Sequence, residues 1–211
     1  MVEPDTLLEQ SLWVKGKLRV VGVDEVGLGP LAGPVLAAAC ILPAGCTLIP
    51  GVRDSKTLSP TQRERLFAEI LHQALSVGVG ASSVSEIEQI NVLEASRLAM
   101  RRALDRVGAF DHVLVDGRPI PGWDPDLSTA VIDGDSFVYS IACASIVAKV
   151  VRDRLMAKLS RRFPGYGWER NAGYPTRDHL ESLKALGPTP FHRRSFAPVR
   201  ELLNTSERLC P

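Results

Sequence analysis

The sequence predicts a mixed α/β fold in which one five-stranded β-sheet is flanked by helices. Short runs rich in Val, Ala and Leu alternate with longer segments whose apolar residues recur at helical spacing. Three strands compatible with antiparallel pairing come first, and alternating helices and strands follow, which is the order expected of a sheet covered by helices. With 211 residues, of which 45% are hydrophobic and 23% charged, the chain can bury a substantial core.

The first half of the chain supplies three of the strands. Residues 19–24 and 34–42 are predicted strands, and the glycine-rich turn between them favours a hairpin-like pair. Ser59 followed by Pro60 is typical of a helix N-terminus, and apolar residues continue at helical spacing to about residue 75. Residues 77–81 are expected to form the third strand.

The second half alternates helices and strands. A short acidic helix from Ser85 is expected to lead into a longer one, and the elements after it are, in order, helix 92–107, strand 112–116, strand 129–132, helix 138–163, helix 176–186 and a short helix at 199–204. The long helix at 138–163 begins in small and apolar residues and ends in basic ones, so its first half is predicted to be core and its second half to face solvent.

Composition is typical of a soluble globular protein. We expect one domain over residues 1–211, with the stretch from about residue 188 packed on it as a helical tail. The N-terminus lacks a signal-peptide pattern and no apolar run is long enough to span a membrane, so a cytoplasmic location follows by elimination. Cys40, Cys46, Cys143 and Cys210 lack zinc-site spacing, and Cys40 and Cys143 are expected to be buried thiols.

Charge is divided along the chain although the net charge is only +1. Residues 149–200 contain 12 Lys or Arg and 4 Asp or Glu, whereas the rest of the chain contains 13 and 20. An acidic part that can hold cations and a basic part that can hold phosphates suit an enzyme acting on nucleic acid. A helix with a basic solvated face is the alternative. No Walker-type phosphate loop is present.

Acidic residues stand where predicted strands end. Asp24 and Glu25 end the first strand, Asp116 ends a later one, and Asp133 and Asp135 precede the long helix. Two charges at the end of an apolar strand are costly unless a cation or strong donors compensate them. A set of acids without His or Cys fits Mg²⁺ or Mn²⁺ better than zinc. A strand that simply ends in a polar turn is the other interpretation of Asp24 and Glu25.

The sequence resembles the bacterial type 2 ribonucleases H, the ribonuclease HII family. The resemblance covers nearly the whole chain and rests on seven segments in order: Gly22–Pro34, Asp54–Ser59, Val115–Gly117, Gly134–Ser136, Ala144–Arg154, Gly173–Thr176 and His192–Phe196. It implies a ribonuclease H-like fold and an endonuclease that uses two Mg²⁺ or Mn²⁺ ions. We expect this endonuclease to be a monomer. The implied substrates are RNA–DNA hybrids and DNA duplexes containing single ribonucleotides, cut to leave 3′-hydroxyl and 5′-phosphate ends.

The resemblance also assigns residues. Asp24, Glu25, Asp116 and Asp135 match the family's four metal-binding acids, whereas Asp133 stands where the family usually has lysine. The residues that match the family's Gly-Arg-Gly stretch and tyrosine, which read the ribose 2′-hydroxyl, are Gly27, Leu28, Gly29 and Tyr174.

Two positions depart from the family pattern. Leu28 replaces the arginine, and the segment before Tyr174 lacks a lysine for which Arg170 or Arg177 can substitute. Lys56 and Arg194 are candidate contacts to backbone phosphates, or else surface salt-bridging residues. These departures leave two alternatives open, a hybrid-binding protein with impaired cleavage and a DNA nuclease of related fold.

Overall fold

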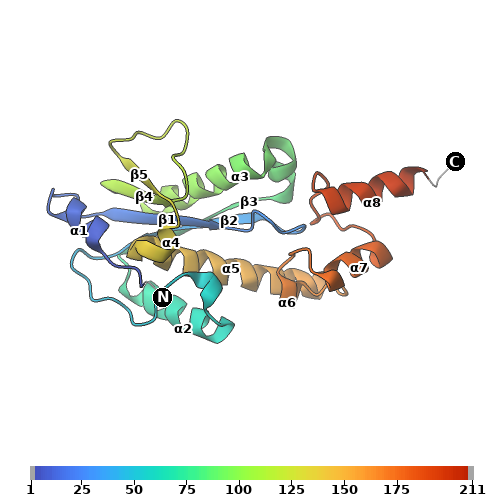
Figure 1. The fold of residues 1–211 in the computed structure, drawn as a ribbon, viewed down its shortest axis with the longest axis horizontal. Coiled ribbons are helices and arrows are strands. Elements are labelled where there is room, and N and C mark those ends of the chain that lie inside the picture. Colours follow the sequence, from blue (N-terminus) through green and yellow to red (C-terminus); the bar gives the residue numbers. More distant parts are fainter. Residues whose placement is uncertain (1–2, 209–211) are drawn as a thin grey trace. The chain divides into compact units, whose positions relative to one another are not determined.

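The five predicted strands form one mixed sheet in the computed structural model, which describes residues 3–208. The strands are β1 (Val20–Val26), β2 (Val35–Ile41), β3 (Ser76–Ser82), β4 (His112–Asp116) and β5 (Ser128–Val131), and their order in the sheet is β3-β2-β1-β4-β5 (Figure 1). β1 and β2 are antiparallel, which confirms the predicted hairpin, and β4 runs parallel to both β1 and β5.

The helices follow the predicted order, with four short additions. They are α1 (Leu7–Trp13), η1 (Ser55–Thr57), α2 (Pro60–Gln73), α3 (Val84–Val107), α4 (Gly134–Phe137), α5 (Tyr139–Arg162), α6 (Trp168–Asn171), α7 (Arg177–Leu186) and α8 (Ala197–Arg208). Ser59 caps α2 through a capping box with Gln62, as the Ser-Pro signal predicts. None of the helices within residues 3–208 is long and apolar enough to cross a membrane.

The chain divides into two compact units. The first contains the residues up to Val26, Leu36–Ala81 and Arg97–Val150, and the second contains Gly27–Val35, Ser82–Ser96 and the residues from Val151 onward. The first unit therefore holds most of the sheet. The second holds the glycine turn after β1 together with α6, α7 and α8.

Helices cover both faces of the sheet in the first unit, where the parts of α3 and α5 that belong to this unit lie on opposite sides of the strands (Figure 1). Glycines allow the close approach. A Cβ added to Gly22 of β1 would lie 2.1 Å from the carbonyl carbon of Ser140 in α5, and one on Gly80 of β3 would lie 2.0 Å from the carbonyl oxygen of Ala99 in α3. Both strands need glycine for this packing.

The two predicted helices around residue 90 form α3, whose backbone breaks at Asn91 with φ of 66°. The side-chain Oδ1 of Asn91 accepts hydrogen bonds from the backbone N–H groups of Leu93 and Glu94 at 2.9 and 3.1 Å. This is N-capping, so Asn91 starts the second half of the helix.

The N-terminal helix α1 was not predicted, because seven residues carry too little helical signal without their tertiary contacts. Leu12 packs with Val138 and Ile141 in a core cluster. The buried carboxylate of Glu9 accepts a hydrogen bond from the Ser140 N–H at 2.8 Å, at the start of α5. Glu9 of α1 therefore caps α5, the long helix that follows Asp135.

Burial follows the prediction for the cysteines and departs from it on the long helix. Cys40 and Cys143 are fully buried, and Cys210 lies outside the described residues. The basic second half of α5 was predicted to face solvent, which is wrong for Arg152, whose exposed fraction is 0%. Its guanidinium is accommodated because three backbone carbonyl oxygens accept its hydrogen bonds.

Candidate active site

The acids of the first unit stand at the carboxyl ends of two adjacent parallel strands. Val23 of β1 pairs with Val115 of β4, so the next residues, Asp24 and Asp116, follow at the same level of the sheet. Asp24 is only 5% exposed, whereas Asp116 and Glu25 are half-buried. The predicted convergence of strand ends is therefore present, since parallel neighbours end at one edge.

Asp135 reaches the same place from a helix. Asp133 adopts the left-handed conformation with φ of 54°, which turns the chain from β5 into α4, and Asp135 is then buried in the first turn of that helix. The backbone N–H of Gly134 donates to Oδ1 of Asp116 at 2.7 Å. A Cβ on Gly134 would lie 2.7 Å from Ile141 Cδ1, so a larger residue at this junction would require the Ile141 side chain to move.

The carboxylates raise each other's pKa. Burial raises the pKa of Asp24 well above its usual range, and the charges of Glu25 and Asp116 add to the effect. Burial followed by the Asp116 charge raises the pKa of Glu25 to about 7. Burial and the Asp135 charge also raise the pKa of Asp116, against the Gly134 hydrogen bond. The four acids thus form one electrostatic cluster that favours added positive charge.

Lys56 supplies part of that charge. Its Nζ lies 3.3 Å from Oδ2 of Asp135, and the side chain itself is 77% exposed. Desolvation opposes the charge of Lys56, but the Asp135 carboxylate outweighs it, so the pKa of Lys56 is raised. η1 presents this lysine, because Asp54 caps η1 by accepting from the Lys56 N–H at 2.9 Å. One exposed ammonium leaves most of the cluster's negative charge unpaired.

The donor set fits a hard divalent cation in its chemistry. All four side chains offer carboxylate oxygens, the ligands that Mg²⁺ and Mn²⁺ prefer, and the raised pKa values of Asp24, Glu25 and Asp116 indicate a deficit of positive charge. Within residues 3–208, no group of three or more His, Cys, Asp or Glu side chains already has the mutual arrangement of a metal cage.

The other predicted site residues, apart from Lys56, belong to the second unit. Gly27 is buried, Leu28 is half-buried and Gly29 is exposed. Tyr174 is 39% exposed, and its Cε1 would lie 3.7 Å from a Cβ added to Gly29. The structure therefore brings the tyrosine and the glycine turn together. Arg194 is exposed.

A buried pair of histidines anchors the backbone of Tyr174. Trp168 Nε1–H donates to Nε2 of His179 at 3.0 Å, so the ring proton of His179 is on Nδ1, which donates to the Tyr174 carbonyl at 2.8 Å. The Thr189 N–H donates to Nδ1 of His192 at 2.9 Å, which leaves the proton of His192 on Nε2, 3.2 Å from Nε2 of His179. Both rings are neutral in this network.

Acid should destabilise the protein through this network. Burial, followed by the neighbouring His179, lowers the pKa of His192 to about 4, while the unfolded value is about 6.5. The neutral form therefore stabilises the fold above pH 6.5, and that contribution, on the order of 3 kcal/mol, is lost as the pH falls toward 4. Urea unfolding at pH 7 and 4.5 measures it.

The histidine variants isolate this effect. The His192→Gln protein should lose less of its unfolding free energy between pH 7 and 4.5 than wild type, because glutamine does not titrate. The exposed His72 of α2 gives the matched control, and His72→Gln should keep the wild-type pH dependence. Equal pH dependence in wild type and His192→Gln would contradict the assignment.

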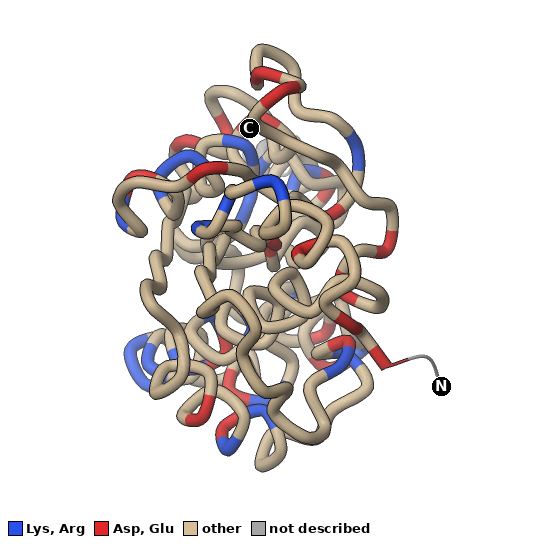
Figure 2. Tube along the Cα trace, turned by 90° about the vertical axis from the view of Figure 1, so that its left-hand side faces the viewer, with Lys and Arg blue, Asp and Glu red and all other residues tan. Residues whose placement is uncertain are grey.

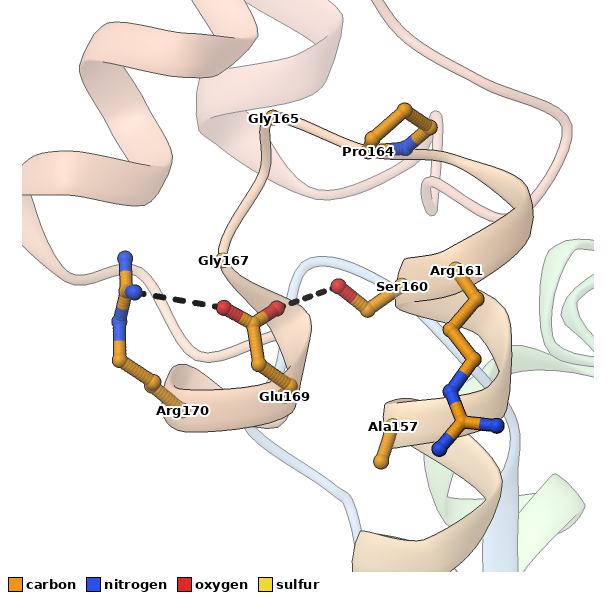
Figure 3. A pocket seen from close by; sticks show the side chains of 8 residues that line it. All are labelled: Ala157, Ser160, Arg161, Pro164, Gly165, Gly167, Glu169 and Arg170. Carbon is orange, nitrogen blue, oxygen red and sulfur yellow. Dashed lines mark hydrogen bonds and ion pairs between the residues drawn. The ribbon is translucent and has the colours of Figure 1, made fainter.

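A hollow of about 580 Å³ lies in the second unit between the end of α5 and α6 (Figure 3). Glu169 lies between two partners there, since it pairs with Arg170 at 3.4 Å and accepts from the Ser160 hydroxyl. The side chain of Arg170 is 75% exposed. None of the four acids lines this hollow.

Some of the basic residues of 149–200 have an acidic partner, as Arg170 has in Glu169. Figure 2 marks Lys and Arg and Asp and Glu along the whole trace, and both kinds occur in many parts of it. Arg177 forms an ion pair with Glu181 at 2.8 Å on α7, so its charge is partly neutralised. Exposed pairs of this kind contribute little to stability.

The mixed sheet in the order β3-β2-β1-β4-β5, flanked by helices, is that of the ribonuclease H-like fold, and carboxylates stand at the ends of its strands β1 and β4. The family model for ribonuclease HII matches residues 21–199. The chain therefore belongs to the ribonuclease HII family. Members of this family are endonucleases that hydrolyse RNA in RNA–DNA hybrids.

Individual relatives support the same family assignment. A ribonuclease HII from Thermosynechococcus vestitus is 55% identical over 99% of this chain and 97% of its own length. The crystal structure of ribonuclease H2 from Pyrococcus horikoshii is similar with a TM-score of 0.71 and 26% identity, covering 90% of this chain and 99% of that one. The structure of Bst-RNase HIII in complex with Mn²⁺ shares the fold with a TM-score of 0.67 at 18% identity, covering 91% and 71%.

Two buried arginines, Arg152 and Arg193, were not predicted as functional residues. The His192–Phe196 segment carries two adjacent arginines, and Arg194 was selected as the phosphate contact, whereas Arg193 is the buried one with many hydrogen bonds. Sequence gave no means of separating them, because the tail has no strand or helix periodicity at that point. Only the fold decides which arginine points inward.

Proposed function

We propose that Asp24, Glu25, Asp116 and Asp135 hold divalent cations and that this centre cuts the RNA strand of hybrids and single ribonucleotides embedded in duplex DNA. The observation that carries the proposal is the shared site of these carboxylates, of which Asp24 and Asp135 are only 5% exposed. Buried acids that raise each other's pKa are unfavourable without a cation. The products would be a 3′-hydroxyl and a 5′-phosphate.

Two Mg²⁺ or Mn²⁺ ions suit the four oxygen-donor side chains. When bound, such ions activate a water and stabilise the charge that develops on the phosphodiester oxygens. The chain's own contribution is to hold the ligands in place before the substrate arrives. The Glu25 N–H fixes Oδ1 of Asp24 at 2.7 Å, and the Gly134 N–H fixes Oδ1 of Asp116 at 2.7 Å.

Substrate recognition is assigned to Gly27, Leu28, Gly29 and Tyr174, with Lys56 and Arg194 on backbone phosphates. The 2′-hydroxyl distinguishes RNA from DNA at a single nucleotide, and an exposed turn with little side chain lets the backbone approach it. Gly29 and Tyr174 are both exposed and lie close together, which supports a shared role. The exposed ammonium of Lys56 next to Asp135 is suited to a phosphate near the acids.

Domain organisation, oligomeric state and location are also proposed. Residues 1–211 are taken as one catalytic domain, with the segment from about residue 188 as its helical tail, and the enzyme as a cytoplasmic monomer. Sedimentation analysis of the purified protein tests the monomer, and a dimer at micromolar concentration would contradict it.

Cleavage of three matched duplexes tests the function. One is DNA only, one is a continuous RNA–DNA hybrid, and one is DNA with a single ribonucleotide. We expect Mg²⁺- or Mn²⁺-dependent cutting of the second and third and none of the first. Cutting of the DNA-only duplex would favour a DNA nuclease of the same fold, and hybrid binding without any product would favour an impaired enzyme.

The effect of Leu28 is measured on the same substrates. If the backbone of the glycine turn does the reading, Leu28→Arg should change the rates on the continuous hybrid and on the single ribonucleotide by less than about threefold, which is under 1 kcal/mol. A selective gain on the single ribonucleotide would instead assign junction recognition to the missing arginine.

A further inference from the structure

Two buried guanidinium groups lie under the glycine turn of the second unit. Arg152 and Arg193 each have an exposed fraction of 0%. No Asp or Glu within residues 3–208 forms an ion pair with either of them. Burial of an arginine without a carboxylate is unusual and calls for other compensation.

Backbone carbonyl oxygens provide that compensation, and five of the six belong to residues 27–34. Arg193 donates from Nη2 to Gly27 at 2.6 Å, from Nη1 to Leu28 at 2.9 Å, and from Nε and Nη2 to Gly33 at 3.0 and 2.9 Å. Arg152 donates to Pro34 at 3.1 Å, Ala32 at 3.1 Å and Ala172 at 2.8 Å. The turn is thus held from inside by two cations.

The glycine turn packs closely against the two guanidinium groups. Gly27 has φ of +100°, and a Cβ on it would lie 2.4 Å from Nε of Arg152. The Arg193 guanidinium also lies 5.1 Å from the centre of the Phe196 ring, which supports its plane. Burial, and then the nearby Arg152, lower the pKa of Arg193 to about 9, so the group keeps its charge at neutral pH.

The turn keeps two backbone donors that no described residue uses. The carbonyls of Gly27 and Leu28 are taken by Arg193, but no described residue accepts a hydrogen bond from the backbone N–H of Leu28 or Gly29. Gly29 is exposed and Leu28 half-buried. Free N–H groups backed by positive charge form a site for an oxygen acceptor of a nucleic-acid backbone.

We propose that Arg193, supported by Arg152, is a positioning residue that holds this turn with the Leu28 and Gly29 N–H groups available to the substrate and supplies from beneath the positive charge that Leu28 lacks. The inference rests on the proposed function, because it assigns the turn to substrate binding. A lysine could carry the charge but could not donate to three carbonyls in one plane.

Kinetics of Arg193 variants on the single-ribonucleotide duplex test the inference. We expect Arg193→Gln to raise KM at least about tenfold, with kcat within about threefold, because the acids that cut are unchanged. Arg193→Lys should be intermediate. Arg161→Gln, which removes an exposed arginine of the same unit, is the matched control and should keep the wild-type KM.

A rescue separates positioning from a purely structural role. In the Arg193→Gln background, Leu28→Arg restores positive charge at the turn and should recover part of the lost affinity, whereas a folding defect would not respond to it. A wild-type KM in Arg193→Gln, or no rescue, overturns the inference and leaves the proposed function intact. A wild-type protein that neither binds nor cuts the duplex overturns the proposed function itself.

Hydrogen exchange in the wild-type protein provides a second test that needs no substitution at Arg193. The amides of Leu28 and Gly29 should exchange more slowly when the metal-free protein is saturated with the single-ribonucleotide duplex, because the substrate then accepts their hydrogen bonds. Unchanged exchange at both amides under saturation would overturn the inference.

Discussion

Replacing Asp24 with asparagine should abolish cleavage and, at the same time, stabilise the metal-free protein. The carboxylate is buried and lies beside Glu25 and Asp116, so its charge opposes folding when no cation is present. Removing that charge should raise the free energy of unfolding at pH 8 by about 1 to 3 kcal/mol. Cleavage should fall by at least about 100- to 1,000-fold, because a ligand charge is lost.

The matched control is Asp133→Asn. Asp133 is exposed and precedes α4 in a left-handed conformation that asparagine also adopts readily. This variant should keep both the wild-type cleavage rate and the wild-type melting temperature. Thermal unfolding with and without Mg²⁺, together with cleavage assays, measures both quantities. An Asp24→Asn protein that is less stable than wild type without metal would contradict the electrostatic account.

Replacing Gly22 with alanine should destabilise the fold by at least about 3 kcal/mol, because overpacking against backbone cannot be relieved by a rotamer change. The added Cβ would lie 2.1 Å from the Ser140 carbonyl carbon and 2.5 Å from the Ile141 nitrogen, at the first turn of α5. Either β1 or α5 must shift, and β1 carries Asp24 and Glu25. Chemical denaturation measures the loss.

The control for Gly22→Ala is Gly29→Ala, where the nearest atom to an added Cβ is 3.7 Å away. That substitution should change the free energy of unfolding by no more than about 0.5 kcal/mol. A Gly22→Ala protein with the stability of Gly29→Ala would show that α5 does not pack on β1 as described.

The predictable part of this fold is the part that local chemistry specifies. Ser59 and Pro60 predict the start of α2, and the apolar runs predict all five strands, because each signal lies within a few residues of the element it sets. The convergence of Asp24 and Asp116 also follows from sequence once both are placed at strand ends. The role of these acids as ligands stays a prediction that the experiments above test.

The unpredicted part depends on contacts between distant segments. α1 forms because Leu12 packs near the start of α5 and Glu9 caps it, and neither partner lies near α1 in sequence. Arg152 was expected in solvent because the second half of α5 is rich in basic residues, yet carbonyls from residues 32, 34 and 172 accept its hydrogen bonds in the interior. Local composition does not show an acceptor that another segment provides.

Cleavage of a DNA duplex with one ribonucleotide, by wild type and by Asp116→Asn, with divalent metal or with chelator, tests the assignment of the four acids as metal ligands. Only wild type with metal should cut, at the ribonucleotide, and leave a 3′-hydroxyl and a 5′-phosphate. Cutting in chelator, or cutting by Asp116→Asn at the wild-type rate, would contradict it.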